Sequence, residues 1–519
     1  MQSFRYIYNM KKLSLYLTLV IAVSHAFAQT STSYQPPVFT DADRLERIKK
    51  AFPVIEKIYR EYAQKNHFPG YAFGIVVDGK LVYSGSGGYT DISKKIPATT
   101  KSMFRIASMS KSFTAMAILK LRDEGKLNLD DPLYLYIPEI KNQQLTTDAP
   151  VITIRNLLTH SAGFPEDNPW GDRQLAKTEE DLINLYKKGI SFSNDPGLAY
   201  EYSNLGFATL GYIIHKVSGI PYEEYIAKNI WQPLGIDASW EYSVIPADQF
   251  AHGYRWLNND WREETPLHDG IYGAMGGMIT SVEAFSKYVA FHLSAWPPRN
   301  DEETGPVKRS SVREMHQPWR FGSLLPDYQF PNGRNCAVTT AYGYGLRIVK
   351  DCEGRTMVAH SGGLPGFGSN WRIMPDYGIG VILFANVTYA PTDGVDLLVL
   401  DTIVRMAGLK PRRLPPSPIL MQRRNELVKL MPDFSAAKVS GIFAENFFLD
   451  YFTDSLKKEA TTIFNNAGKL IKIGEVVPEN QLRGYFIMEC EHGNVQVSFT
   501  LTPETPALIQ EYHIRLLKQ

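Results

Sequence analysis

Ser108 and Lys111 stand three residues apart, which is the spacing of a serine nucleophile and a lysine base. Residues three apart lie on one face of a helix, so the two side chains can meet if a helix begins near Ser108. The positive end of that helix would lower the proton affinity of the lysine, and a partly neutral lysine can accept the proton of the serine hydroxyl. The pair therefore predicts covalent catalysis through an acylated serine.

The residues that follow support a helix at this place. Apolar side chains fall near one helical face and a glycine offers a stop: Phe113, Met116, Leu119, Leu121 and Gly125. The motif alone has little specificity, because Ser-x-x-Lys also occurs at Ser435 and at Ser455. The alternative for Ser108 is a serine at a helix N-terminus followed by a solvated lysine.

A second motif, Tyr202-Ser203-Asn204, comes just before another expected helix. A tyrosine near the nucleophile could relay a proton between Ser108, Lys111 and a leaving group. Asn204 could hydrogen-bond Lys111 and a substrate carbonyl. The alternative is that Tyr202 packs in the core and Asn204 caps the helix.

A third motif, His360-Ser361-Gly362-Gly363, follows a short apolar strand. A glycine-rich strand edge lets a substrate lie against the backbone. The N–H groups of Gly363 and Ser108 could together form an oxyanion hole. His-x-Gly recurs at His268, in a loop-like stretch, and the alternative for His360 is a structural histidine at a strand end.

Composition and the N-terminus narrow the class of protein. The chain has 519 residues, 44% of them hydrophobic, and a net charge of +1, so there is no basic field to indicate nucleic acid as a partner. Lys11 and Lys12 precede an apolar run, and Ala26-Phe27-Ala28 provides a cleavage site, so residues 1–28 read as a signal peptide. The run is too short for a comfortable membrane span. We expect a periplasmic or secreted protein with no stable membrane insertion once the signal is removed.

There are three cysteines. Cys336 and Cys352 flank an expected strand at residues 342–349, so a disulfide between them is compatible with an oxidising compartment. Cys490 shares a strand face with apolar residues and is expected to be a buried thiol. No cysteine–histidine cluster has zinc spacing, and we expect neither a metal nor another cofactor.

The expected elements form strands at both ends of the main domain with a helical insert between them, which predicts an α/β or α+β layered fold. Residues 41–66 are expected to be a helix, residues 71–84 a hairpin, and residues 356–359, 370–374 and 378–386 further strands before a closing helix at 395–407. Residues 164–197 are expected to form a long loop that shapes a substrate pocket.

A proline-rich linker at residues 410–418 predicts a domain boundary. It separates a main domain, residues 29–409, from a small α+β domain, residues 419–519. The small domain, with Asn480-Gln481-Leu482-Arg483-Gly484 and Leu501-Thr502-Pro503-Glu504, is similar to NTF2-like cone folds and shows no catalytic constellation.

Taken in order, the three motifs resemble the serine β-lactamase-related superfamily, in its class C β-lactamase, D-aminopeptidase and esterase branch, over roughly residues 51–408. The resemblance implies a sheet flanked by helices, with an inserted helical domain and the active site between them. It implies Ser108 as nucleophile and Lys111 and Tyr202 as general acid/base partners. Residues expected to line the substrate site are Asn204, His360, Ser361 and Gly362.

One departure from the pattern concerns substrate choice. Class C β-lactamases carry a lysine where this chain has His360, whereas a histidine is familiar from D-aminopeptidases of the same family. A histidine is mostly neutral at pH 7, so His360 is expected to attract a substrate carboxylate less than lysine would.

The sequence therefore predicts an exported serine hydrolase that cleaves small amides or esters, with D-amino-acid peptides or esters favoured. The alternatives are a β-lactamase or penicillin-binding DD-carboxypeptidase and, in another class, a catalytically silent binding protein. The expected partner is a small-molecule or peptide substrate, and no oligomeric state is specified.

Overall fold

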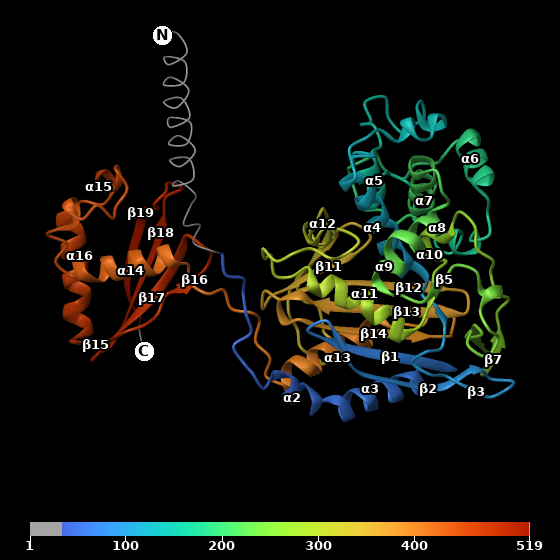
Figure 1. The fold of residues 1–519 in the computed structure, drawn as a ribbon, viewed down its shortest axis with the longest axis horizontal. Helices are drawn as coiled ribbons and strands as arrows, with labels where there is room; N and C mark the ends of the chain where they lie inside the picture. The colour runs from blue at the N-terminus through green and yellow to red at the C-terminus, as the bar shows by residue number, and fades with distance from the viewer. Residues whose placement is uncertain (1–33, 518–519) are drawn as a thin grey trace, which may run out of the picture. The chain divides into compact units, whose positions relative to one another are not determined.

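The computed structural model describes residues 34–517 and forms two compact units (Figure 1). The large unit spans Phe39–Arg412, and the small unit is built from Arg413 onward together with the segment that ends at Val38. The expected signal peptide, residues 1–28, lies outside the described residues. No helix of the described part of the chain is long and apolar enough to cross a membrane.

A nine-stranded antiparallel sheet forms the frame of the large unit, in the order β3-β2-β1-β14-β13-β12-β11-β10-β9. Its strands are β1 (Gly70–Val77), β2 (Lys80–Asp91), β3 (Ile96–Pro97), β9 (Arg320–Leu325), β10 (Val338–Tyr342), β11 (Arg347–Asp351), β12 (Thr356–Leu364), β13 (Phe367–Met374) and β14 (Ile379–Ala385). Strands β1 and β14 come from opposite ends of the unit in sequence, yet they are neighbours in the sheet. They pair from Tyr71↔Ala385 to Val77↔Ile379.

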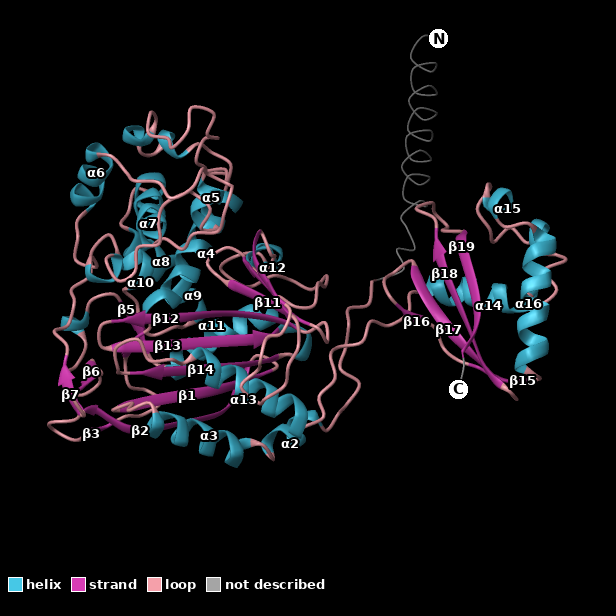
Figure 2. Cartoon of the chain, turned by 180° about the vertical axis from the view of Figure 1, so that it is seen from behind, coloured by secondary structure: helices cyan, strands magenta, loops and turns pink. Residues whose placement is uncertain are grey.

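Two hydrophobic cores cover the two faces of this sheet. Successive residues of a strand point to opposite faces. In β1, Ala72 and Val76 join one core, while Phe73 and Ile75 join the other. The second core holds α2 (Arg44–Lys49), α3 (Phe52–Lys65) and α13 (Asp393–Met406), which Figure 2 shows along one side of the sheet.

The helical insert packs on the opposite face, where the first core continues into it (Figure 2). Its members, with the helices on either side of it, are α4 (Ser110–Asp123), α5 (Ile154–Leu158), α6 (Glu179–Lys188), α7 (Asn204–Ser218), α8 (Tyr222–Ile226), α9 (Gln232–Leu234), α10 (Gly273–Gly276), α11 (Val282–Ser294) and α12 (Arg309–Met315). Helix α4 is buried along nearly its whole length, so it lies at the centre of the packing between the sheet and the helical insert. The layered α/β fold expected from the sequence is confirmed.

Several expected elements have different bounds in the structure. The stretch 342–349 is not one strand: β10 ends at Tyr342 and β11 begins at Arg347, with a turn between them that contains Gly345 at φ 66°. The expected helix at 41–66 is two helices, because Pro53 begins a new helix at α3. The stretch 164–197 contains α6, which a capping box between Thr178 and Asp181 starts.

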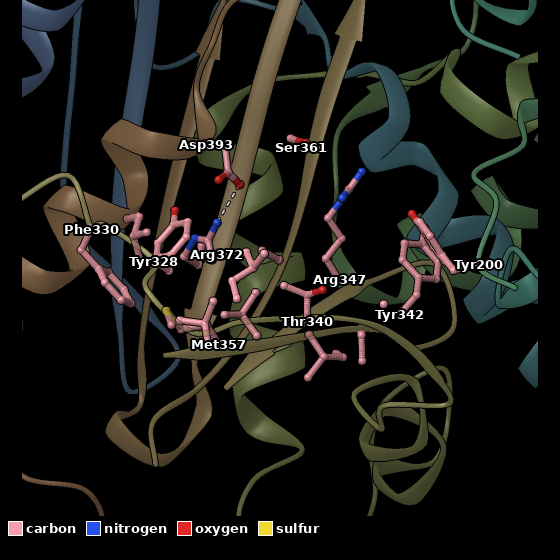
Figure 3. A pocket seen from close by; sticks show the side chains of 18 residues that line it. Tyr200, Tyr328, Phe330, Thr340, Tyr342, Arg347, Met357, Ser361, Arg372 and Asp393 are labelled. Atoms are coloured by element: carbon pink, nitrogen blue, oxygen red, sulfur yellow. Dashed lines mark hydrogen bonds and ion pairs between the residues drawn. The ribbon is translucent and has the colours of Figure 1, made fainter. Parts of the chain in front are cut away.

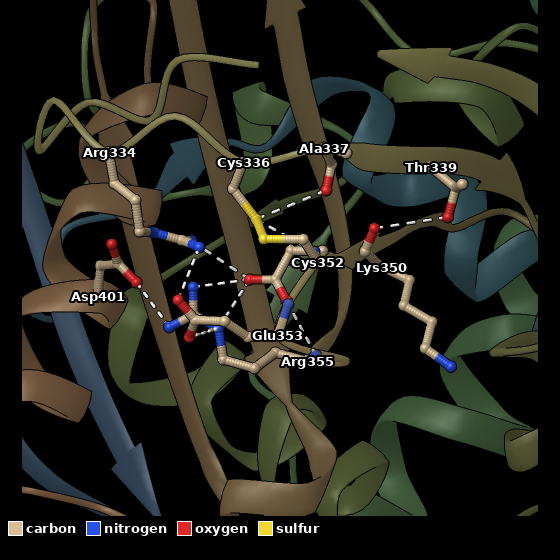
Figure 4. Close-up of a disulfide and its surroundings, with 10 residues drawn as sticks. Arg334, Cys336, Ala337, Thr339, Lys350, Cys352, Glu353, Arg355 and Asp401 are labelled. Carbon is tan, nitrogen blue, oxygen red and sulfur yellow. Dashed lines mark hydrogen bonds and ion pairs between the residues drawn. A yellow bond between two sulfur atoms is a disulfide. The ribbon is translucent and has the colours of Figure 1, made fainter. Parts of the chain in front are cut away.

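A disulfide joins Cys336 and Cys352, with Cα atoms 5.7 Å apart (Figure 4). The two cysteines lie at the open end of the β10–β11 hairpin, where neighbouring strands bring residues of high sequence separation together. Beside them, Arg355 contacts both Asp351 and Asp401, so the covalent link stands next to a buried ion-pair network. The third cysteine, Cys490, is a buried free thiol, as expected.

The small unit has its own hydrophobic core beneath an antiparallel sheet. The sheet follows the order β15-β17-β18-β19, and β16 also pairs with β17. Its strands are β15 (Leu470–Ile473), β16 (Val477–Pro478), β17 (Arg483–Cys490), β18 (Gly493–Leu501) and β19 (Ile509–Leu517), and its helices are α14 (Pro418–Leu430), α15 (Phe447–Asp450) and α16 (Thr453–Ala467). The NTF2-like assignment stays a prediction.

Candidate active site

Ser108 lies at the point where a short strand turns into helix α4. Strand β4 (Phe104–Arg105) pairs with β8 (Ile279–Thr280), and Ala107 then adopts φ 51°, which is uncommon for a residue with a side chain. Ser108 follows in a single 3₁₀ turn before α4 and is 7% exposed. A backbone held in this strained form at a cleft is typical of functional sites.

Lys111 is fully buried beneath Ser108. Its Nζ donates to Ser108 Oγ at 3.0 Å, to Asn204 Oδ1 at 2.8 Å and to the carbonyl oxygen of Met275 at 2.9 Å. Burial lowers the pKa of Lys111 to about 7, although nearby carboxylates, Asp172 first among them, oppose that shift. Lys111 is therefore partly neutral at physiological pH and can act as a base.

Tyr202 covers Lys111 from the side of the helical insert. Lys111 Nζ lies 4.8 Å from the centre of the Tyr202 ring, and the ring of His160 packs 4.3 Å from that of Tyr202. Burial holds the pKa of Tyr202 well above its usual range, while a hydrogen bond with Ser108 lowers it. The phenol is thus protonated at neutral pH, so it can give a proton but is a poor first base.

Asn204 is the first residue of α7 and is fully buried. Its side-chain amide nitrogen, Nδ2, donates to Asn168 Oδ1 at 2.6 Å. The side-chain oxygen, Oδ1 of Asn204, is therefore free to accept from Lys111. Asp167 accepts the backbone N–H groups of Asn204 and Leu205, at 2.6 and 2.8 Å. A carboxylate at a helix N-terminus is favourable, so Asp167 fixes both the start of α7 and the side chain that contacts Lys111.

Strand β12 runs beside the nucleophile. A Cβ on Gly362 would lie 2.2 Å from the carbonyl oxygen of Ile106, so only glycine allows the strand to approach this closely. The β11 ladder ends with Arg347↔Ala359, and no further pairing with β11 is found for residues 360–364 in the described chain. The N–H groups of Ser108 and Gly363 thus stand near an unpaired strand edge, where the oxyanion hole was predicted.

His360 lies in β12, two residues before Gly362, and is 1% exposed. Its Nδ1 is 2.6 Å from the carbonyl oxygen of Ser361, which can only accept, and its Nε2 is 2.9 Å from the hydroxyl of Tyr342. The ring therefore carries its hydrogen on Nδ1 and accepts on Nε2. Burial, with Arg347 and Lys111 nearby, keeps the pKa of His360 well below its usual range. Neither ring nitrogen has a hydrogen bond left for a substrate.

Arg347 is a site residue that sequence reasoning missed. Its guanidinium carbon lies 5.8 Å from the centre of the Tyr202 ring, and the residue is exposed. It lines a cavity of about 350 Å³ together with Tyr200, Tyr342 and Ser361. Figure 3 shows its guanidinium on the side of Ser361 and Tyr200, whereas Arg372, at the other end, pairs with Asp393. Within residues 34–517, Arg347 has no ion-pair partner.

The first two motifs, Ser108–Lys111 and Tyr202–Asn204, thus meet at one place, and the third brings Gly362 and His360 beside them. The other residues that sequence reasoning missed are Asp167, Asn168, Asp172 and the carbonyl of Met275. Only the long polar stretch after Phe164 pointed toward the first three, and nothing in the sequence pattern pointed toward Arg347.

Comparison with known proteins shows the family to which a chain with this arrangement belongs. The Beta-lactamase family model matches residues 55–404, which include the three motifs that meet at this site. The chain belongs to the β-lactamase family.

Two relatives are similar to a large part of this chain. Protein flp of Staphylococcus aureus (strain N315) is 30% identical over 344 residues, which cover 65% of this chain and 64% of that protein. Penicillin-binding protein 4* of Bacillus subtilis (strain 168) is 28% identical over 332 residues, covering 60% of this chain and 67% of that protein. The chain therefore spans under two thirds of the first of these relatives.

Two solved structures share the fold. An octameric penicillin-binding protein homologue from Pyrococcus abyssi has a TM-score of 0.57 at 24% identity and covers 90% of each chain. A penicillin-binding protein from Bacillus halodurans has a TM-score of 0.52 at 23% identity and covers 67% of this chain and 98% of its own. At these identities the likeness concerns the fold alone.

Proposed function

We propose that the protein hydrolyses small amides or esters of D-amino acids through an acyl-enzyme on Ser108. The observation that carries this proposal is the contact between Lys111 and Ser108, 3.0 Å apart, with the pKa of Lys111 lowered to about 7. A base of that pKa is matched to chemistry at neutral pH. The preference for D-amino acids rests on the resemblance of the His360 motif to the D-aminopeptidase branch.

The residues suggest a division of labour. Ser108 Oγ attacks the carbonyl carbon as Lys111 takes the hydroxyl proton, and the N–H groups of Ser108 and Gly363 receive the negative charge that develops on the carbonyl oxygen. Tyr202, which stays protonated, gives its proton to the departing nitrogen or oxygen and regains one from Lys111. Water then attacks the Ser108 ester by the same route in reverse, which releases the acid and restores the serine.

Arg347 favours substrates that carry a carboxylate on the leaving side. An exposed guanidinium without an ion-pair partner, beside Tyr202 and Ser361, can bind a carboxylate with two parallel hydrogen bonds. It supplies a positive charge that His360 lacks. This supports the DD-carboxypeptidase or β-lactamase alternative as a second activity of the same site, and the penicillin-binding proteins among the relatives motivate testing a penicillin.

The proposed place of action is outside the cytoplasm, in the periplasm or beyond. The Cys336–Cys352 disulfide supports an oxidising compartment, as does the expected signal sequence.

The test of the proposed function is covalent labelling with a fluorophosphonate probe. Ser108→Ala should lose the label, and Ser455→Ala, which alters an exposed Ser-x-x-Lys motif in the small unit, should keep it. Undiminished labelling of Ser108→Ala would assign the nucleophile to another serine. No labelling of the wild type, together with no ester hydrolysis, would favour the silent binding protein instead.

A further inference from the structure

A second cavity lies on the face of the large sheet that carries the helical insert, away from Ser108. Its volume is about 540 Å³, within the range of about 300–1,000 Å³ that is typical of small-molecule sites. It meets β12 at Thr356 and Val358, four to six residues before Gly362, which is about 13–20 Å along a strand at about 3.3 Å per residue. The described residues that line it include none from the three motifs, so this cavity is separate from the candidate active site.

Strand register builds the floor of this cavity from two rows of side chains. The first row is apolar and its members are paired across three neighbouring strands: Ala341, Ile348 and Val358. The second row lies two residues further along each strand and therefore on the same face: Thr339, Lys350 and Thr356. Lys350 thus stands at the polar border of an apolar floor.

Aromatic side chains extend this apolar surface. Phe321 of β9 pairs with Ala341, which continues the first row, and it is 62% exposed. Trp296 also lines the cavity, and its Nε1 donates to Nδ1 of His316 at 2.9 Å, so the indole is held in place. A preformed apolar cavity with an exposed ring at its rim favours a ligand that carries a large apolar group.

Two opposite charges line the same cavity, and neither is paired. Lys350 and Asp376 are both exposed, and within residues 34–517 neither side chain has an ion pair or a hydrogen bond. Figure 4 shows the Lys350 side chain extending away from the ion-pair network of Arg355. Partial burial raises the pKa of Asp376, and the positive charges of Arg412 and Lys350 oppose that shift, so Asp376 and Lys350 lie within electrostatic reach of each other.

We propose that this cavity binds a free amino acid with a large apolar side chain. Lys350 binds its carboxylate, Asp376 binds its ammonium group, and its side chain lies over the apolar row beside Trp296. A simple carboxylic acid would meet Lys350 but be repelled by Asp376, and a simple amine would meet the reverse, so the pair of charges selects a zwitterion. This site goes beyond the proposed function, because binding here requires no reaction at Ser108.

The test is calorimetric titration of the full chain with phenylalanine, in its D and L forms. Three analogues each lack one feature: N-acetylphenylalanine lacks the ammonium group, phenethylamine lacks the carboxylate, and alanine lacks the large side chain. Each analogue should bind about tenfold more weakly or worse, as expected for the loss of a charge-assisted contact or of apolar burial. This series needs no variant of the protein.

Variants then assign each contact. In Asp376→Asn the ratio of Kd values for N-acetylphenylalanine and phenylalanine should fall toward one, and in Lys350→Met the same should hold for phenethylamine and phenylalanine. Lys80→Met, which removes an exposed lysine from β2, is the matched control and should bind phenylalanine as the wild type does. Arg347→Met should also retain binding, because Arg347 lines the other cavity, beside Ser361.

The proposal is overturned if phenylalanine does not bind, or if N-acetylphenylalanine and phenethylamine bind as tightly as phenylalanine. Loss of binding in Arg347→Met with full binding in Lys350→Met would place the ligand at the active site and also overturn it. None of these results depends on the labelling of Ser108, which tests the proposed function separately.

Discussion

The hydroxyl of Tyr342 lies 2.9 Å from Nε2 of His360, and it closes the last free position on that imidazole. Because Nδ1 of His360 is committed to the carbonyl oxygen of Ser361, the ring is held in one neutral tautomer. His360 therefore acts as a brace between β12 and β10. A positive charge that could bind a substrate carboxylate has to come from another residue, and Arg347 is the exposed cation nearby.

A lysine at position 360 should destabilise the protein. His360→Lys places a charge in a fully buried site near Arg347 and Lys111, and we expect a loss of about 3 kcal/mol or more in the free energy of unfolding at pH 7. The folded protein would bind the proton less tightly than the unfolded chain, so the deficit should shrink as the pH rises toward 10. Thermal unfolding of His360→Lys and of the neutral control His360→Gln at pH 7 and pH 9.5 measures this; equal melting temperatures of the two variants would contradict it.

The rate should follow the neutral form of Lys111. Since burial lowers the pKa of Lys111 to about 7, kcat/KM for a neutral p-nitrophenyl ester should rise as the pH increases through about 7 and then level off. Lys111→Arg, which stays charged, should lose about 10²- to 10⁴-fold. The measurement is a pH–rate profile from pH 5 to 9, corrected for spontaneous hydrolysis. A profile without a rise near neutrality would assign the base to another group.

Asp167 should tune that profile without touching the substrate. Its carboxylate raises the pKa of Lys111, so Asp167→Asn should move the rising limb to lower pH. The variant also loses an acceptor at the start of α7, which should reduce kcat by loosening Asn204. Glu180→Gln, an exposed change on α6, serves as the control and should leave the limb in place. An unchanged limb in Asp167→Asn would show that Asp167 acts on the helix alone.

The Cys336–Cys352 disulfide should contribute to stability more than to catalysis. It closes a segment with a sequence separation of 16, for which the loss of chain entropy in the unfolded state is worth about 3 kcal/mol. Cys336→Ala/Cys352→Ala should lower the melting temperature of the large unit, with kcat/KM retained at 25 °C. Reductant should lower the wild-type melting temperature and leave the double variant unaffected; a double variant as stable as the oxidised wild type argues against this contribution.

A histidine pair away from the site should make the protein sensitive to acid. Trp296 Nε1 donates to Nδ1 of His316, whose Nε2 then donates to Nδ1 of His292 at 2.8 Å, so both buried rings are neutral. Burial lowers the pKa of His316 to about 3, and stability should therefore fall as the pH drops below about 6.5. His316→Gln should flatten the dependence of the melting temperature on pH between 6.5 and 4. A parallel curve for the variant would place the acid sensitivity elsewhere.

The local sequence pattern was sufficient to predict the catalytic motifs, because the spacing and residue types within each motif determine how its side chains are placed. Ser108 and Lys111 meet through helical spacing, and Gly362 is needed wherever a strand passes close to another backbone. The layered fold followed from strands at both ends of a helical insert. The capping box Thr178–Asp181 was available to predict α6 and was missed.

Pattern could not supply the residues that reach the site by tertiary pairing. Arg347 comes to the site only because β11 begins after a turn that the sequence presented as continuous strand. Asp172 arrives on a loop whose position depends on Tyr389, more than 200 residues later. Such contacts depend on which distant segments pair, and a single sequence carries no local trace of that choice.

The unpaired edge of β12 also bears on how this protein can change over generations. The groups that perform the chemistry are locked together: Gly362 admits no side chain, and Lys111 is held by three partners. Two residues beside them, Asp172 and Tyr389, lie in the short 3₁₀ turn Gly171–Arg173 and in the connecting segment after β14. Substitutions there can redirect the enzyme to new substrates while the reaction itself is inherited intact.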